Sequence, residues 1–347
     1  MISPPNRVRN RHQRFISSIL WVAAAFALFA IPSVSRNVLA AAQAADSGPV
    51  QAAQRQFNAG NYAAAINALQ APASQNSSNA DVYYWLGRSY YEIRDYDNAI
   101  TQGEKSIALD PKNSVYHDWL GREYGGKADR DRSFSDAKKV KKEFEEAVRL
   151  NPSNIDARRD LEEYLIDAPW IAGGNKDEGR DQVDAIAAID PVEGHLARAK
   201  FDEDALKKPD EVESEYREAL DGKPKNLKAY FEAAEFFQRE NKPAEIDTVI
   251  QEASQVSSND PRLSYFRAVS AVLSDTNLGP AEQNLKSYLA STADRSDWPS
   301  HADAREWLGR LYESQGKRTE AAEQYRASLQ LDPSRKETRN RLQKLEK

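Results

Sequence analysis

The amino-acid sequence predicts an all-α solenoid built from repeated pairs of helices. The motif Trp-Leu-Gly-Arg-x-Tyr occurs three times, beginning at Trp85, Trp119 and Trp307, and the first two copies lie 34 residues apart. A fixed period of this length, with small and aromatic residues at set positions, is typical of a two-helix unit that buries its apolar face against its neighbours. The length of 347 residues therefore measures the number of repeats rather than the number of globular domains.

The clearest unit spans residues 80–113. Its small residues let two antiparallel helices approach closely, and a proline near its end stops the second helix. This unit resembles the tetratricopeptide repeat, and the residues that match the family pattern are Leu86, Gly87, Tyr90, Ala99, Ser106 and Pro111. Gly103 departs from the pattern, because the family has a bulky apolar residue there. The resemblance implies a right-handed α-solenoid that binds proteins or peptides in a concave groove.

In this register the chain divides into about eight units, followed by a capping helix. The units are residues 46–79, 80–113, 114–154, 155–192, 193–226, 227–261, 262–301 and 302–335. Residues 336–347 are charged, with only Leu342 and Leu345 at helical spacing, and predict a helix that shields the apolar face of the last unit.

Three units depart from the regular pattern. The third has 41 residues, and its surplus of seven is about two turns at roughly 3.6 residues per turn, so both of its helices are expected to be longer. The fourth contains a loop over residues 168–174, and we expect Trp170 in this loop to pack against the solenoid. In the fifth, Lys200 and Val212 replace small residues, which predicts looser helix packing.

The first 44 residues have the layout of a secretory signal peptide. Arginines without any acid precede an apolar run from Ile16 to Ile31, which is shorter than the roughly 20 residues of a membrane-spanning helix. Ala42-Gln43-Ala44 predicts cleavage after Ala44, with Ala40 as the second choice. We expect a secreted, periplasmic protein, and an uncleaved anchor facing the periplasm is the alternative, since a slightly longer segment can span a thin bilayer.

Charge and composition exclude several functions. The formal net charge of −6 becomes −11 once the five arginines of residues 1–44 are removed, and such a charge repels nucleic acid. The chain has no cysteine, so disulfides, thiol chemistry and a lipoprotein anchor are excluded. His117, His195 and His301 lie in three different units, which gives no support for a metal site. We therefore predict a protein without cofactor, metal or catalytic residues.

The candidate groove residues are a tryptophan and an arginine three positions apart in each copy of the motif. Members of the resembled family line their concave groove with these positions of the first helix, and the i, i+3 spacing places each pair on one helix face. An arginine there can lie on an indole or bind a ligand carboxylate. Alternatively, the tryptophans pack between repeats and the arginines pair with acids such as Asp118 or Glu306. The pairs are Trp85 with Arg88, Trp119 with Arg122, and Trp307 with Arg310.

A second candidate is the basic hairpin, residues 127–142, which contains seven basic and three acidic residues. Its lysines at 139, 141 and 142 have glutamates four positions later, so we expect Lys139 with Glu143, Lys141 with Glu145 and Lys142 with Glu146 to pair on a solvated face.

Together these observations predict an exported, non-catalytic adaptor that binds a protein or peptide in its concave groove. The alternative is a membrane-anchored structural subunit or assembly factor of an envelope complex that acts through its convex face or the basic hairpin.

Overall fold

Helices form every regular element in the computed structural model, which describes residues 48–206, 209–291, 294–295 and 297–347. The all-α fold class is therefore confirmed for this part of the chain, and the predicted signal segment, residues 1–44, lies outside it.

After a helical stretch over residues 48–58 come α2 (Tyr62–Ser74), α3 (Ala80–Glu92), α4 (Tyr96–Leu109), α5 (Ser114–Asp131), α6 (Phe134–Leu150), α7 (Ile155–Asp167), the 3₁₀ turn η1 (Trp170–Ala172), α8 (Lys176–Ile189), α9 (Pro191–Phe201), the π-helical segment η2 (Asp202–Leu206), α10 (Pro209–Asp221), α11 (Lys228–Arg239), α12 (Pro243–Val256), α13 (Pro261–Ser274), α14 (Leu278–Ser291), α15 (His301–Ser314), α16 (Arg318–Leu331) and α17 (Lys336–Leu345).

Local sequence signals fix where many of these helices begin. An asparagine side chain accepts a hydrogen bond from the first turn of α3, α5, α7 and α8, which satisfies backbone amides that have no partner inside the helix. Proline at the first helical position starts α9, α12 and α13, where its missing amide hydrogen costs nothing. The capping asparagines are Asn79, Asn113, Asn154 and Asn175.

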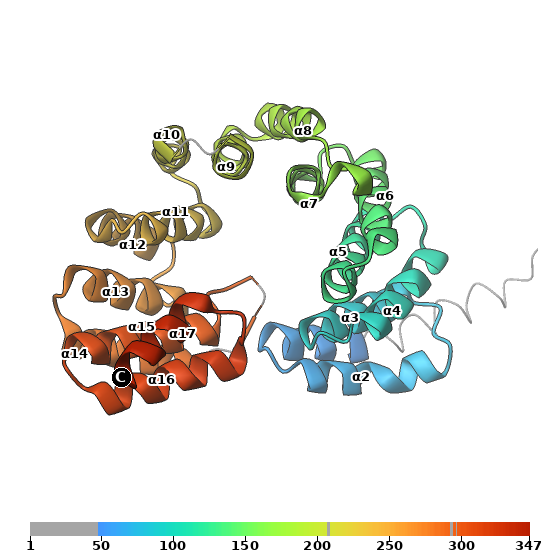
Figure 1. Ribbon diagram of the computed structural model, residues 1–347. Coiled ribbons are helices and arrows are strands. Elements are labelled where there is room, and N and C mark those ends of the chain that lie inside the picture. The colour runs from blue at the N-terminus through green and yellow to red at the C-terminus, as the bar shows by residue number, and fades with distance from the viewer. Residues whose placement is uncertain (1–47, 207–208, 292–293, 296) are drawn as a thin grey trace, which may run out of the picture.

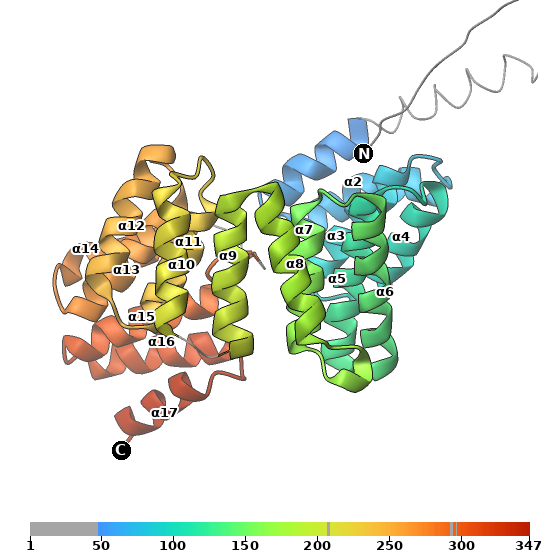
Figure 2. The same ribbon diagram turned by 90° about the horizontal axis from the view of Figure 1, so that it is seen from above.

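Successive helices pack as antiparallel neighbours and stack into a curved solenoid (Figure 1). In this view α5 and α7 lie on the inner side of the curve, and α6 and α8 lie on the outer side; Figure 2 shows α8, α9 and α10 side by side. The curve brings the first unit against the loop that ends the seventh unit. The Tyr62 hydroxyl donates a hydrogen bond to the backbone carbonyl of Asp294 at 3.4 Å, and the Arg295 guanidinium donates one to the carbonyl of Asn58 at 3.5 Å.

The buried apolar residues form four clusters. The largest runs from Leu196 to Tyr325 and holds the helices from α9 to α16 together. Leu342 and Leu345 of α17 pack against it, so the last helix covers the apolar face of the final unit, as a capping helix should. The three smaller clusters extend from Val50 to Leu86, from Ile100 to Leu165 and from Ile166 to Phe201.

A buried glutamate explains the unusual glycine of the second unit. Glu123 of α5 is 1% exposed, and its carboxyl group lies against both Gly87 and Gly103. A Cβ atom at either glycine would overlap a carboxyl oxygen of Glu123. Gly103 therefore stands where the family has a bulky residue because the side chain of the next unit already fills that space. Burial raises the pKa of Glu123 well above its usual range, so the group is held in its neutral form.

The structure shows how the three irregular units fold. α5 and α6 contain 18 and 17 residues, which confirms the longer helices of the third unit. In the fifth unit Val212 is fully buried, while Lys200 forms an ion pair with Asp204 at 2.7 Å and α9 continues into the π-helical segment. The expectation for Trp170 is wrong, because this side chain is 84% exposed. Its loop is nevertheless anchored, since the Tyr164 hydroxyl donates to the carbonyl of Ala172.

Neither a membrane span nor a metal site is evident within the described ranges. None of the helices there is long and apolar enough to cross a bilayer. Nor do three or more histidine or acidic side chains converge there in a way that would hold a metal ion. His117 instead has a structural role, because its Nδ1 lies 2.7 Å from the carboxylate of Glu143 and its Nε2 lies 3.2 Å from the carbonyl of Pro111.

Candidate functional site

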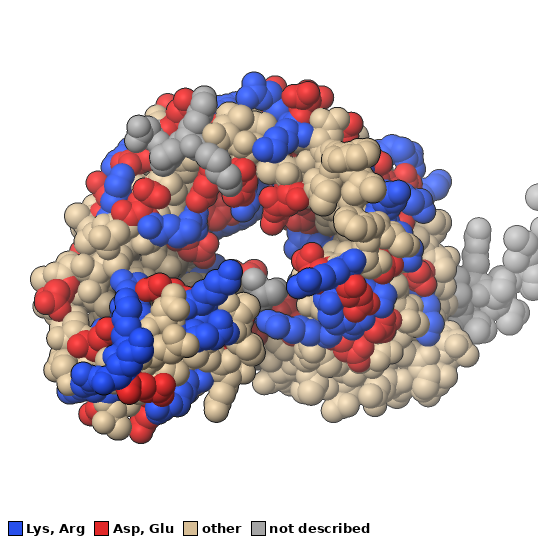
Figure 3. Space-filling view, in the orientation of Figure 1, with Lys and Arg blue, Asp and Glu red and all other residues tan. Residues whose placement is uncertain are grey.

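A charged channel follows the concave side of the solenoid. Two cavities of about 920 Å³ and about 930 Å³ lie along it and share four lining residues, Arg122, Asp160, Glu163 and Asp297. The first helices of successive units, from α5 to α15, supply most of the other lining residues. Figure 3 shows acidic and basic side chains gathered around the opening at the centre of the molecule. We call this combined space the channel.

The first two tryptophan and arginine pairs form one continuous stack. The guanidinium carbon of Arg88 lies 4.5 Å from the ring centre of Phe57, 4.6 Å from that of Trp85 and 4.0 Å from that of Trp119. Nη1 also donates a hydrogen bond to the Tyr84 hydroxyl at 3.3 Å. Burial lowers the pKa of Arg88, and its Nε is buried without a hydrogen-bond partner. Arg88 therefore joins three consecutive units through aromatic rings.

Arg122 follows in the same stack but is neutralised. Its guanidinium lies 4.8 Å from the ring centre of Trp119, donates a short hydrogen bond to Asp160, and lies 3.6 Å from Asp118. Burial alone would lower the pKa of Arg122, but these two carboxylates outweigh it and raise the pKa. Burial and the neighbouring Asp160 in turn raise the pKa of Asp118 well above its usual range. The arginine that lines the channel thus already has acidic partners.

The third pair lies in the core near the other end of the chain. Trp307 is 6% exposed and belongs to the large apolar cluster, which also contains Tyr265. The Arg310 guanidinium lies 3.9 Å from the Trp307 ring centre, and burial lowers its pKa. Neither residue lines the two cavities described above. The structure therefore brings four of the six candidate residues together and leaves Trp307 and Arg310 apart.

This difference between the stacks predicts different contributions to stability. Arg88→Ala removes a cation from its three nearest aromatic rings, at about 0.5–1 kcal/mol for each, so we expect a loss of about 2 kcal/mol in the free energy of unfolding. Arg310→Ala removes one such contact and should cost about 0.5–1 kcal/mol. Urea unfolding followed by circular dichroism compares the two variants. Equal losses would show that the three-ring contact adds nothing.

Sequence reasoning missed three acidic residues of the channel. Glu163 and Glu235 occupy the ninth position of their units, the same position as the three arginines, and both line the second cavity. Glu162 occupies the eighth position, where the repeat has a small residue, and is 1% exposed. Their positions in the repeat could have indicated these residues, because Glu163 and Glu235 share the ninth position with the three arginines. Acidic residues are so common in this chain that these three did not stand out.

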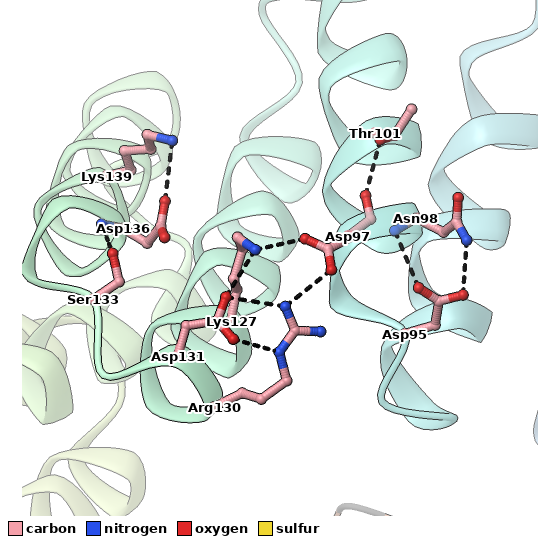
Figure 4. Close-up of polar contacts among 10 residues, drawn as sticks. All are labelled: Asp95, Asp97, Asn98, Thr101, Lys127, Arg130, Asp131, Ser133, Asp136 and Lys139. Atoms are coloured by element: carbon pink, nitrogen blue, oxygen red, sulfur yellow. Dashed lines mark hydrogen bonds and ion pairs between the residues drawn. The ribbon is translucent and has the colours of Figure 1, made fainter.

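The basic hairpin is neutralised largely by contacts that the sequence spacing did not reveal. Lys127 and Arg130 both bind Asp97 of the preceding unit, at 2.5 Å and 2.9 Å, as well as Asp131 (Figure 4). Of the three expected lysine and glutamate pairs only Lys141 with Glu145 forms, at 3.7 Å. The other two expectations are wrong, because Lys139 pairs with Asp136 and Lys142 with Glu143.

Comparison with known families matches residues 50–114 and 281–336 to the tetratricopeptide repeat. Two segments of the chain thus match this repeat. Two of the three Trp-Leu-Gly-Arg-x-Tyr motifs, those at Trp85 and Trp307, lie within them. The tetratricopeptide fold is a protein-interaction module, and residues 115–280, outside the two matches, continue the same succession of packed helices.

Solved structures with a similar fold are distant in sequence. A monomeric mutant of IFIT1 bound to m7Gppp-AAAA has 16% identity and a TM-score of 0.53, with 85% of this chain and 71% of that chain covered. The human IFIT1 dimer has 17% identity and a TM-score of 0.50, with 84% and 71% covered. The APC/C hetero-tetramer Cut9-Hcn1 has 13% identity and a TM-score of 0.52, with 80% and 52% covered. These likenesses concern the tetratricopeptide fold alone. No curated protein matches the chain.

Proposed function

We propose that this protein is a non-catalytic scaffold that binds a protein or peptide partner in the channel. The continuity of the channel carries the proposal, because two cavities that share lining residues allow one extended segment to contact several units. The lining side chains project from packed helices, so little conformational entropy is lost when a partner binds. The acidic balance of the mature chain, with a formal charge of −11, argues against nucleic acid as the partner.

Site-specific photo-crosslinking tests the location of binding. A photoreactive residue replaces Glu163, which is exposed and lines both cavities, or Asp184, which is exposed on the outer helix α8. The two variants differ in the face of the solenoid that carries the probe. In the native envelope we expect a discrete crosslinked product from position 163 and none from position 184. Products from position 184 alone would contradict binding in the channel.

We also propose export to the periplasm with removal of residues 1–44, which rests on the signal layout of the sequence. N-terminal sequencing of the protein recovered from an envelope fraction is expected to begin at Ala45. A start at Met1 together with membrane association would support the anchored alternative instead.

An exposed aromatic loop favours a second function, that of a structural subunit that contacts its partner through residues 168–174. Trp170 and Ile171 are 84% and 50% exposed, and Phe134 at the start of the neighbouring α6 is 57% exposed. Solvent exposure of large apolar side chains on an anchored loop is typical of a contact surface. Trp170→Ala is expected to release a partner from affinity-purified complexes if this surface is used, while crosslinking from position 163 distinguishes the channel.

A further inference from the structure

The charged groups that line the second cavity are unequally paired. Each of the six cationic residues lies within ion-pair distance of a described carboxylate: Arg122, Arg159, Lys200, Lys228, Arg239 and Arg262. In contrast, the carboxyl groups of Glu162, Glu163 and Glu235 form no hydrogen bond or ion pair with any residue that the structure describes. The channel therefore contains surplus acceptors, and its cations are already used.

An ion pair between two helices places these carboxyl groups. Arg159 of α7 binds Glu232 of α11 at 2.9 Å, across the channel wall. Glu162 lies three residues after Arg159, and Glu235 lies three residues after Glu232, so each follows its bridge partner on the same helix face. Glu162 and Glu235 thus each lie about one helical turn after the bridge, on α7 and α11.

Burial makes the missing partners costly. Glu162 is 1% exposed, and its Oε1 is buried without a donor; Oε1 of Gln238, on the same cavity wall, is also buried without one. A buried acceptor that lacks a donor destabilises the folded protein, and a donor on a ligand would remove that cost. Because the groups without partners include carboxyl groups, the donor that fits them best is a cationic one.

The protonation of these groups is consistent with a cation site. Burial raises the pKa of Glu162 to about 8 and that of Glu235 to about 7, so each is partly protonated near neutral pH. A bound cation favours the charged form and displaces these protons. The charged groups that face them are Arg159, Glu163, Lys200 and Asp204 for Glu162, and Arg239, Glu232, Asp303 and Arg262 for Glu235.

We propose that the channel wall formed by α7 and α11 binds lysine or arginine side chains of an extended partner, with Glu162, Glu163 and Glu235 as the acceptors. The inference rests on the proposed function, since it requires a peptide in the channel. An ammonium offers three donors and a guanidinium five, so either group can supply the donor that each carboxyl group lacks. The negative charge of the mature chain attracts a basic segment during encounter.

Fluorescence anisotropy with three labelled octapeptides tests the charge preference, the peptides being alternating lysine and alanine, glutamate and alanine, or glutamine and alanine. We expect the basic peptide to bind, and to bind about tenfold or more weakly to the double variant Glu163→Gln with Glu235→Gln. The matched control is Glu320→Gln with Glu323→Gln on the outer helix α16, which removes the same charge from exposed residues and should change the affinity little.

Calorimetry adds a readout that unspecific attraction does not produce. Binding of the basic peptide at pH 7, measured in buffers of different ionisation enthalpy, should release protons from the wild type and fewer from Glu162→Gln with Glu235→Gln. If the basic peptide binds equally well to Glu163→Gln with Glu235→Gln and to the control Glu320→Gln with Glu323→Gln, the inference is overturned. If only the neutral or acidic peptide binds, or if none binds while position 163 still crosslinks to a partner, the cation site is wrong and the proposed function stands.

Discussion

Replacing Gly121 by alanine is expected to destabilise the protein by about 1–3 kcal/mol, because the core has no room for the added methyl group. A Cβ atom there would overlap the edge of the Phe144 ring, which is 5% exposed in the cluster between Ile100 and Leu165. Gly121 is the glycine of the second Trp-Leu-Gly-Arg-x-Tyr motif, so the prediction tests why that position must be small. The measurement is the free energy of unfolding in urea.

Gly125, one turn further along α5, is the matched control. The nearest atom to a Cβ atom at this position is 4.0 Å away, on Val140, so alanine fits without strain. Gly125→Ala is expected to stabilise by about 0.5–1 kcal/mol, since alanine has the higher helix propensity. Effects of the same sign in the two variants would show that helix propensity, rather than close packing, decides the residue at Gly121.

The buried carboxyl group of Glu123 is expected to make stability fall as the pH rises. Its pKa in the folded protein lies above the unfolded value, so unfolding releases a proton. The contribution of Glu123 to the free energy of unfolding is complete below the unfolded pKa. As the pH rises further, this contribution is lost at up to about 1.4 kcal/mol per pH unit. Glu123→Gln keeps the shape of the neutral acid but cannot ionise, so its stability should decline less steeply by that amount.

Urea unfolding between about pH 5 and 8 measures this slope. Glu320→Gln on the exposed face of α16 is the control and should follow the wild type. Asp118, Glu162 and Glu235 also have raised pKa values and give both proteins a common background decline. Parallel curves for Glu123→Gln and the wild type would contradict a neutral, buried Glu123.

The sequence predicted those features that each repeat determines for itself. The helix pairs, the longer third unit and the capping helix follow from period, spacing and prolines. Features that join different units were beyond it. The contact of Lys127 with Asp97, and the space that Glu123 takes from Gly103, depend on side-chain directions across an interface between units.

The candidate site shows the same division. Periodicity placed Arg88 and Arg122 in register on adjacent helices, and the structure joins them in one aromatic stack. It could not show that Asp160 neutralises Arg122 or that Trp307 lies in the core, because both depend on which neighbour fills the adjoining space. Nor could spacing separate Glu162 from the many solvated acids of the chain.

The division of the apolar core into four clusters has a mechanical consequence. Between the cluster from Val50 to Leu86 and the cluster from Ile100 to Leu165, the buried side chains include Ser89, Ser106 and Glu123. Little apolar area therefore resists separation of these two clusters. A force that pulls the ends of the chain apart is therefore expected to break the contacts of Tyr62 and Arg295 first and then to open the solenoid at this boundary, which the Arg88 stack helps to bridge. The cluster from Leu196 to Tyr325 is expected to unfold at a higher force and as one unit. The N-terminal part of the solenoid would then be more extensible than the C-terminal part.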